Sequence, residues 1–169
     1  MPGVSAFDRA VDMLARRMRT EREMRGLLSG KTRGRVSGGR EVVGYDESEI
    51  DDAIERLKEF GYIDDRAYAE RYRETRVEKK RGHRRIKEEM LRRGLSAEIV
   101  EETLAGGYVE EVERANAAAV AAKALEALPE DMDPRRKARK ISSRLVAQGY
   151  GYEVINPVIE DLIFRGENG

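Results

Sequence analysis

The stretch GYIDDRAYAERY, residues 61–72, places two adjacent carboxyl groups, Asp64 and Asp65, among three tyrosines. Two carboxylates aimed at one point could act as general acid and general base. Adjacent residues of a helix do not face each other, however, so this pair would not share a site. A joint between helices explains the stretch: Gly61 ends one helix, Asp64 caps the next, and Asp65 lies near its positive end. Tyr68 and Tyr72 then lie one turn apart on the inner face of this next helix. We predict a structural role for the acidic pair.

Three other patterns suggest nucleotide or metal chemistry. SGKT at 29–32 resembles part of a phosphate-binding loop, but Arg25 occupies the position of the required earlier glycine, and the motif follows an expected helix instead of a strand. His83, the sole histidine, has no orienting partner nearby in the sequence. Asp51 and Glu55 share a helix face, but a hard cation prefers more oxygen ligands than one helical turn presents. We therefore expect no cofactor, no metal site and no enzymatic activity.

Composition narrows the class of protein further. The chain of 169 residues has no cysteine, which excludes disulfides and thiolate chemistry and fits a reducing compartment. No apolar run approaches the roughly 18 residues of a membrane helix. We expect a cytoplasmic protein that does not associate with membranes. Since 33 basic and 33 acidic residues give a net charge of zero, the distribution of charge must carry the electrostatic information.

Apolar residues recur at helical spacing through most of the chain. Their pattern over residues 7–18 predicts one helix face. Thr20 and Glu23 form a capping-box pattern ahead of a second helix, because the hydroxyl and the carboxylate can each accept a backbone N–H. Asp-Pro at 133–134 predicts a later helix start. Asn-Pro at 156–157 predicts that the last helix is kinked or begins late.

The strongest internal signal is a sequence repeat. Residues 84–104 align without a gap with residues 139–159. The matched pairs are Ile86 with Ile141, Met90 with Leu145, Leu91 with Val146, Gly94 with Gly149, Ile99 with Val154, and Leu104 with Ile159. A weaker first copy has Met24 and Leu28 in the places of Ile86 and Met90, and residues 31–44 interrupt it.

We therefore predict an all-α fold of three tandem three-helix repeats, over residues 1–62, 63–107 and 108–169. One such unit buries its apolar face poorly alone, so neighbouring units are expected to stack into an elongated array. The first repeat carries a basic, glycine-rich insertion at 31–44. This insertion is compatible with a small hairpin or with a mobile loop.

Charge is segregated along the chain. Residues 71–93 hold eleven basic and four acidic side chains, whereas residues 46–70 hold three basic and ten acidic ones. Residues 134–148 hold six basic and no acidic side chains, and residues 98–113 hold six acidic and no basic ones. The first repeat contributes Arg16, Arg17, Arg19, Arg22 and Arg25. Stacked repeats would collect these charges into a basic and an acidic stripe.

A basic stripe favours phosphate backbones or an acidic protein surface, and salt should weaken either interaction. The alternative is that these charges only keep helices solvated and pair with one another. The sequence does not choose between a nucleic acid and a protein as the partner.

Several motifs together resemble the RecX family of bacterial recombination regulators. They are TEREMRGLL, GYDESEIDDAIERLKEFGYIDDRAYAERY, RGHRRIKEEMLRRGLS and QGYGYEVINPVIEDL, which span nearly the whole chain. The resemblance implies a curved protein of three tandem three-helix units that binds RecA filaments and has some affinity for DNA. It also implies lower RecA ATPase, strand-exchange and co-protease activity, in homologous recombination, DNA repair and the SOS response. The chain departs from the family at the insertion 31–44 and at Met24, where leucine is common.

The resemblance and the basic runs give the expected filament- or DNA-binding residues. Arg81, Arg84, Arg85 and Lys87 match the family's central basic motif, Arg92 and Arg93 lie beside the glycine turn, and the later run adds Arg136, Lys137, Arg139 and Lys140. We expect a monomer whose protein partner is the RecA filament, with DNA bound weakly or through the filament. The competing hypothesis is a stand-alone, sequence-independent nucleic-acid-binding helical module. A metal-dependent nuclease is a third, more distant hypothesis.

Overall fold

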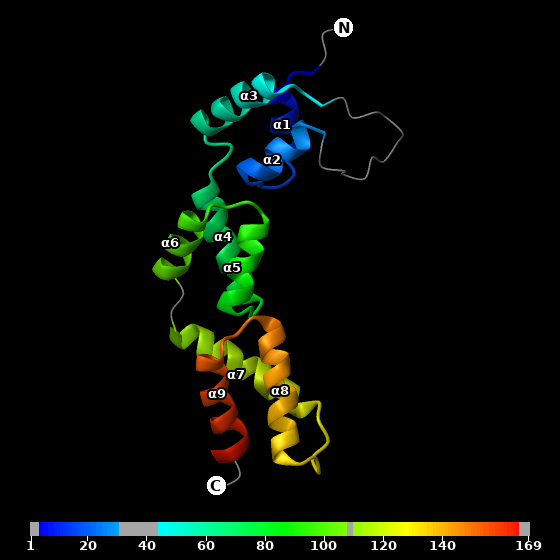
Figure 1. The fold of residues 1–169 in the computed structure, drawn as a ribbon, viewed down its shortest axis with the longest axis vertical. Helices are drawn as coiled ribbons and strands as arrows, with labels where there is room; N and C mark the ends of the chain where they lie inside the picture. The colour runs from blue at the N-terminus through cyan, green and yellow to red at the C-terminus, as the bar shows by residue number, and fades with distance from the viewer. Residues whose placement is uncertain (1–3, 31–43, 108–109, 166–169) are drawn as a thin grey trace. The chain divides into compact units, whose positions relative to one another are not determined.

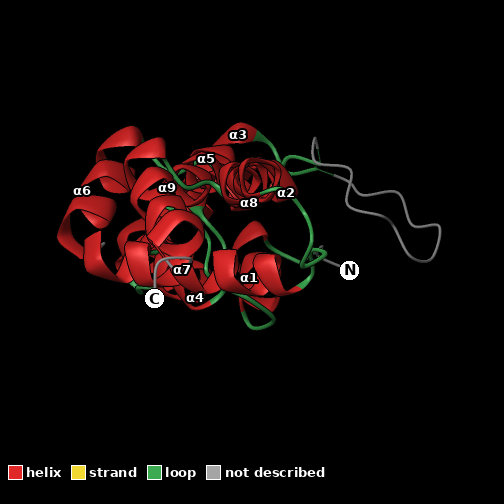
Figure 2. Ribbon diagram, turned by 90° about the horizontal axis from the view of Figure 1, so that it is seen from below, coloured by secondary structure: helices red, strands yellow, loops and turns green. Residues whose placement is uncertain are grey.

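The computed structural model describes residues 4–30, 44–107 and 110–165, and every regular element in these ranges is a helix (Figures 1 and 2). The predicted all-α class is confirmed. The helices are α1 (Ala6–Leu14), α2 (Glu21–Leu28), α3 (Glu47–Glu59), α4 (Asp65–Glu78), α5 (His83–Arg92), α6 (Ala97–Gly107), α7 (Glu110–Glu126), α8 (Pro134–Gln148) and α9 (Tyr152–Ile159), followed by the π-helix η1 (Glu160–Arg165). The predicted insertion falls on residues 31–43 and so lies outside the described residues, apart from Gly44.

The chain forms two compact units. Unit 1 comprises Met1–Ala69 and Leu91–Ile99, and unit 2 comprises Glu70–Met90 and Val100–Gly169. The core of unit 1 joins α1, α2 and α3 and contains Met24, Leu28, Ile54 and Leu57. The core of unit 2 joins α7, α8, α9 and η1 and contains Ile141, Leu145, Tyr150 and Ile155. Each predicted repeat range contains three of the described α-helices, and the division into three repeats stays a prediction.

Burial follows the sequence repeat closely. Ile86 and its counterpart Ile141 are 0% and 1% exposed, and Met90 and Leu145 are both fully buried. The outward positions match as well, since Leu91 and Val146 are both exposed. The alignment therefore identifies positions with the same structural environment.

The glycine turns of the two copies share a backbone conformation. Gly94 and Gly149 have φ angles of +88° and +95°. Only glycine adopts this left-handed region without a steric penalty, which explains why both copies have glycine there.

The start of α2 packs against the turn after α5, and both belong to unit 1. The hydroxyl of Thr20 donates to the carbonyl oxygen of Arg93 at 2.7 Å and accepts from the N–H of Glu23 at 3.1 Å. A Cβ on Gly94 would lie 2.2 Å from Cδ of Arg22. We call this contact, between residues 20–23 and 93–94, the first joint.

A second joint in unit 2 brings residues 82–85 against residues 148–149. The N–H of Gly82 donates to the carbonyl of Gln148 at 3.0 Å, and the N–H of Arg84 donates to that of Gly149 at 3.1 Å. In the repeat alignment Gly82 corresponds to Thr20 and Gln148 to Arg93. The equivalent carbonyl therefore accepts a hydrogen bond from a side-chain hydroxyl in the first joint and from a backbone N–H in the second.

Most predicted helix caps are confirmed. The carboxylate of Asp64 accepts from the N–H of Ala67 at 2.9 Å, and that of Asp133 accepts from the N–H of Arg136 at 3.0 Å. Gly61 follows α3 with a φ of +70°. The Thr20 cap forms, but the carboxylate of Glu23 accepts from Arg93 at 2.9 Å, so the capping-box pattern was only half right.

One predicted helix bound was wrong, and one of the two alternatives predicted for the last helix is excluded. The first helix ends at Leu14 instead of continuing to Met18, because Thr20 must be extended (φ −74°, ψ 159°) to cap α2. Met18 is consequently exposed. At the other end, α9 begins at Tyr152, ahead of Pro157, so a late start is excluded. The helix instead changes to π-helical bonding at Glu160, three residues after a proline that has no N–H to donate.

Candidate binding surface

The basic residues predicted on and around α5 are mostly engaged within the protein. Arg85 donates through Nε to Glu89 at 3.0 Å and through a terminal nitrogen to the carbonyl of Ala147 at 3.0 Å. Arg81 donates to the side-chain oxygen of Gln148. Both side chains therefore hold the second joint together and are only partly available to a partner.

Glu89 is the centre of the network that fixes Arg85. It also accepts from the hydroxyl of Tyr72 at 2.7 Å and lies 3.0 Å from Nε of Arg76. Burial opposes ionisation of Glu89, but the hydrogen bonds from Tyr72 and Arg85 outweigh it and lower the pKa of the carboxyl. Glu89 therefore lies at the centre of a network of charge-assisted hydrogen bonds inside unit 2.

The remaining predicted residues of α5 are engaged more loosely. Lys87 pairs with Glu101 on α6. A terminal nitrogen of Arg84 lies 3.6 Å from a carboxylate oxygen of Glu153 on α9, and all four residues belong to unit 2. The side chain of Arg84 is 59% exposed, so this pair is a weak surface interaction. Arg84 and Lys87 could exchange these partners for an external anion.

Arg93 belongs to the first joint. Besides Glu23, it donates to the hydroxyl of Tyr68 at 3.0 Å, and its carbonyl accepts from Thr20. Arg92 next to it is exposed and lines a pocket described below. The structure thus gives Arg93 a structural role within unit 1.

The basic residues predicted on α8 make fewer contacts within the protein than those on α5. Within the described residues, the side chains of Arg136, Arg139 and Lys140 are exposed and make no hydrogen bond or ion pair. Lys137 is partly buried, and its ammonium group donates to the carbonyl of Glu130 at 2.7 Å. The sequence of α8 contains no acidic residue that could neutralise these charges.

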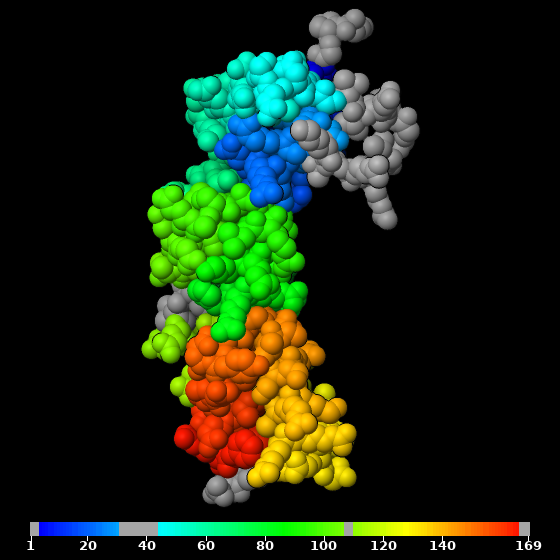
Figure 3. Space-filling model, viewed as in Figure 1, coloured from blue at the N-terminus to red at the C-terminus, as the bar shows by residue number. Residues whose placement is uncertain are grey.

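The helical period explains this presentation. Ile141 and Leu145, one turn apart, face the core of unit 2. Arg136, Arg139 and Lys140 are three and four residues apart, so they share the opposite face of α8. Figure 3 shows the yellow and orange side chains of this segment at the surface of unit 2. We call these three residues the α8 basic face; the equally exposed Arg135 and Arg144 flank it and were not among the predicted site residues.

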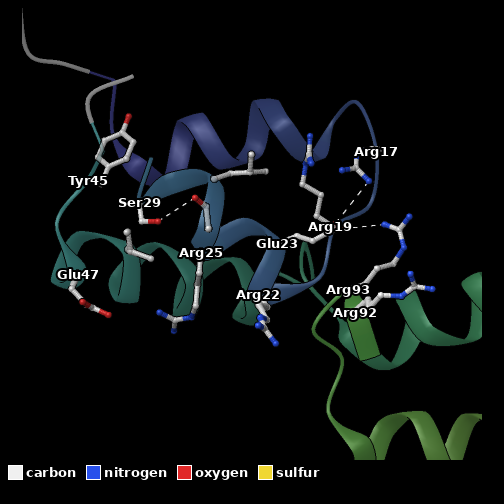
Figure 4. A pocket seen from close by; sticks show the side chains of 13 residues that line it. Arg17, Arg19, Arg22, Glu23, Arg25, Ser29, Tyr45, Glu47, Arg92 and Arg93 are labelled. Atoms are coloured by element: carbon white, nitrogen blue, oxygen red, sulfur yellow. Dashed lines mark hydrogen bonds and ion pairs between the residues drawn. The ribbon is translucent and has the colours of Figure 1, made fainter. Parts of the chain in front are cut away.

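A pocket of about 750 Å³ opens on unit 1. Six arginines line it: Arg17, Arg19, Arg22, Arg25, Arg92 and Arg93 (Figure 4). Arg92 and Arg93 were predicted site residues, whereas Arg17 and Arg19 were noted only as part of a basic run. Sequence reasoning missed the combination because more than seventy residues separate the two pairs along the chain.

The acidic pair of the opening motif is structural, as predicted. Asp64 caps α4, while the carboxylate of Asp65 accepts from the N–H of Glu21 at 2.9 Å, at the start of α2 in the same unit. Burial raises the pKa of Asp65, although the hydrogen bond from Glu21 opposes this. The two carboxylates therefore serve two different helix starts.

Two other positions considered from sequence, Asp51 and His83, are engaged within the protein, whereas the SGKT pattern at 29–32 extends outside the described residues at positions 31 and 32. Asp51 pairs with Arg25, and the N–H of His83 donates to the carboxylate of Glu113 at 2.9 Å. In the part of the chain that the structure describes, no group of three or more histidine, aspartate or glutamate side chains could hold a metal ion. None of the described helices is both long and apolar enough to cross a membrane.

Comparison with known proteins gives consistent matches. The family model described as "RecX, second three-helix domain" matches residues 64–104. A "Regulatory protein RecX" of Clostridium botulinum strain Alaska E43 is 30% identical over 159 residues, which are 94% of this chain and 68% of that protein. A protein of the same name from Thermus thermophilus is 34% identical over 109 residues, 64% of this chain and 67% of that protein.

Solved structures show the same fold. The crystal structure of RecX from Lactobacillus salivarius superposes with a TM-score of 0.78 at 24% identity, covering 93% of this chain and 94% of that one. A second crystal structure, of a regulatory protein RecX, gives a TM-score of 0.75 at 22% identity, covering 95% of this chain and 71% of that one.

Proposed function

Because the chain belongs to the RecX family of regulatory proteins, we propose that it binds RecA–DNA filaments and lowers their ATPase, strand-exchange and co-protease activities. In this role it takes part in homologous recombination, DNA repair and the SOS response. It acts as a monomer in the cytoplasm, without a cofactor and without catalytic chemistry of its own.

The α8 basic face is the observation that supports this proposal best. Its three cationic side chains are exposed and have no partner within the described residues. An ion pair or hydrogen bond already made inside the protein must be broken before its arginine can bind elsewhere, and this cost falls on Arg81, Arg85 and Arg93. The α8 basic face carries no such cost, so it is the preferred contact for a filament phosphate or carboxylate.

The test measures the single-strand-dependent ATPase of RecA as the protein is titrated in. We expect the wild type to lower the rate and the double variant Arg136→Glu/Lys140→Glu to inhibit much less. Lys123→Glu is the matched control for the charge reversal of Lys140, because Lys123 is an exposed lysine on α7 without a partner in the described residues. An unchanged ATPase rate at saturating wild-type protein defeats the proposal.

Charge reversals on α5 would be a poor test. Arg85→Glu would face Glu89 and lose the hydrogen bond to Ala147, so it would disturb the second joint. Loss of inhibition could then reflect damage to unit 2 instead of a lost contact. The α8 basic face avoids this ambiguity.

The same helix supports the second candidate, a stand-alone nucleic-acid-binding module. If each of three cations neutralises one phosphate of single-stranded DNA, the affinity should fall with salt with a logarithmic slope of about −2. Binding through these phosphate contacts should also be tolerant of the nucleic-acid sequence. Tight, salt-sensitive DNA binding in the absence of RecA, together with no effect on RecA ATPase, would favour this candidate.

A further inference from the structure

The pocket on unit 1 has an unbalanced charge. Its lining contains six arginines but only two carboxylates, those of Glu23 and Glu47, and one of the six, Arg25, is paired outside the lining with Glu21 and Asp51. Figure 4 shows the imbalance concentrated at one end, where Arg17 and Arg93 converge on Glu23 and Arg92 lies beside Arg93. Arg93 donates to Glu23 at 2.9 Å, whereas Arg17 reaches the other carboxylate oxygen only at 3.8 Å. The carboxylate of Glu23 therefore pairs with two guanidinium groups.

Arg19 adds an unmet hydrogen-bonding group to this end of the pocket. Its Nε is buried and, like Oε2 of Glu23, has no hydrogen-bond partner among the described residues. Burial first, and the neighbouring charge of Arg17 second, lower the pKa of the Arg19 guanidinium. A buried donor without an acceptor and a cluster of like charges both destabilise the protein unless an anion compensates them.

The chemistry of the lining selects the type of anion. Guanidinium groups bind phosphate oxygens through pairs of parallel N–H donors, and several such groups require an anion with many oxygens and more than one charge. A single carboxylate supplies neither. The volume of about 750 Å³ lies within the range of small-molecule sites.

We propose that this pocket binds an oligophosphate group, such as pyrophosphate or a triphosphate, either free or carried by a nucleotide. Arg17, Arg19 and Arg92 are its binding side chains, and Arg93 anchors Glu23 at the rim. The segment between α1 and α2 and the end of α5 each contribute, so binding would tie these two parts of unit 1 together. This site is separate from the α8 basic face in unit 2.

Isothermal titration of the full chain with inorganic tripolyphosphate tests the proposal, with sulfate at equal ionic strength as the reference anion. We expect tripolyphosphate to bind more tightly than sulfate. Arg17→Gln should weaken binding about tenfold, the effect of losing one charge-assisted hydrogen bond. Because the side chain of Arg17 is 53% exposed and its ion pair is long, this variant should fold and melt normally.

Arg9→Gln is the matched control, since Arg9 is an exposed arginine on α1 that does not line the pocket, and its loss should leave tripolyphosphate affinity unchanged. Comparison of ATP with tripolyphosphate identifies the source of the phosphates: tighter ATP binding indicates a nucleotide, and equal binding indicates recognition of the phosphates alone. Equal affinities for sulfate and tripolyphosphate, or equal losses in Arg17→Gln and Arg9→Gln, would overturn the proposal. The proposal would also fail if tripolyphosphate did not bind but oligothymidylate bound in a way that depends on Arg17, because the pocket would then contact a nucleic-acid backbone.

Discussion

Gly149→Ala should destabilise the protein through the second joint far more than a conformational penalty alone would. The φ of +95° at Gly149 costs a non-glycine residue about 1 to 2 kcal/mol. The new Cβ would also lie 2.3 Å from Cβ and 2.6 Å from the backbone N of Arg85. These atoms are held by α5 and cannot simply rotate away, so overpacking adds about 1 to 3 kcal/mol. We expect a total loss of about 2 to 5 kcal/mol.

Gly61→Ala is the control that separates the two contributions. Gly61 has a φ of +70°, but a Cβ there would meet nothing within 4 Å. This variant should therefore lose only the conformational part, about 1 to 2 kcal/mol. Gly94→Ala tests an intermediate situation, because Cδ and Cγ of Arg22 can rotate away from the new Cβ, whereas Cβ of Arg22, at 2.6 Å, is held by α2.

Urea unfolding followed by far-ultraviolet circular dichroism gives the free energy of unfolding of each variant, provided that the urea dependence stays the same. The expected order of destabilisation is Gly149→Ala, then Gly94→Ala, then Gly61→Ala. Equal losses in Gly149→Ala and Gly61→Ala would refute the close approach at the second joint. The loss would then come from the backbone angle alone.

Three further predictions concern single groups. Thr20→Val should cost about 1 to 2 kcal/mol of unfolding free energy in urea, because the hydroxyl both caps α2 and donates to Arg93. A loss smaller than that of the same substitution at an exposed threonine would contradict the first joint. Burial raises the pKa of Glu113 above its ordinary 4.5, so the folded chain binds this proton more tightly and stability falls as pH rises from 4.5 through the raised pKa. Glu113→Gln keeps an acceptor for the N–H of His83 and should remove this decline in a thermal melt series from about pH 4 to about pH 8, whereas an identical slope in both proteins would exclude the effect. Asp133→Ala should lower the unfolding free energy by about 1 kcal/mol through loss of the α8 cap, and an unchanged melting curve would show that the cap is dispensable.

Local features of the fold could be predicted from the sequence because their causes lie within a few residues. The caps at Asp64 and Asp133 depend on a side chain and an N–H three residues apart, and the helical period marked Ile141 and Leu145 as inward-facing. The end of α1 at Leu14 was missed because a competing requirement, the extended conformation of the next cap, overrode a continuing apolar pattern.

The candidate site could be predicted only in part, because pairing over long distances in the chain decides which charges are available. Arg85 and Arg139 are similar in sequence terms, since each lies in a basic run. The structure separates them: Arg85 is held by Glu89 and by the carbonyl of Ala147, 62 residues away, whereas Arg139 has no such partner among the described residues. The association of Arg17 with Arg92 likewise depends on the first joint.

The two joints have a consequence for how such chains change length. In each, the beginning of one helix meets the glycine turn of a later segment, so the two contributing surfaces are different and the contact does not close on itself. A contact of this head-to-tail type allows a further copy to be appended by gene duplication without inventing a new interface. The Clostridium botulinum relative is longer than the region it shares with this chain, which covers 68% of it. A chain that gains such a contact grows longer while the contact itself stays the same.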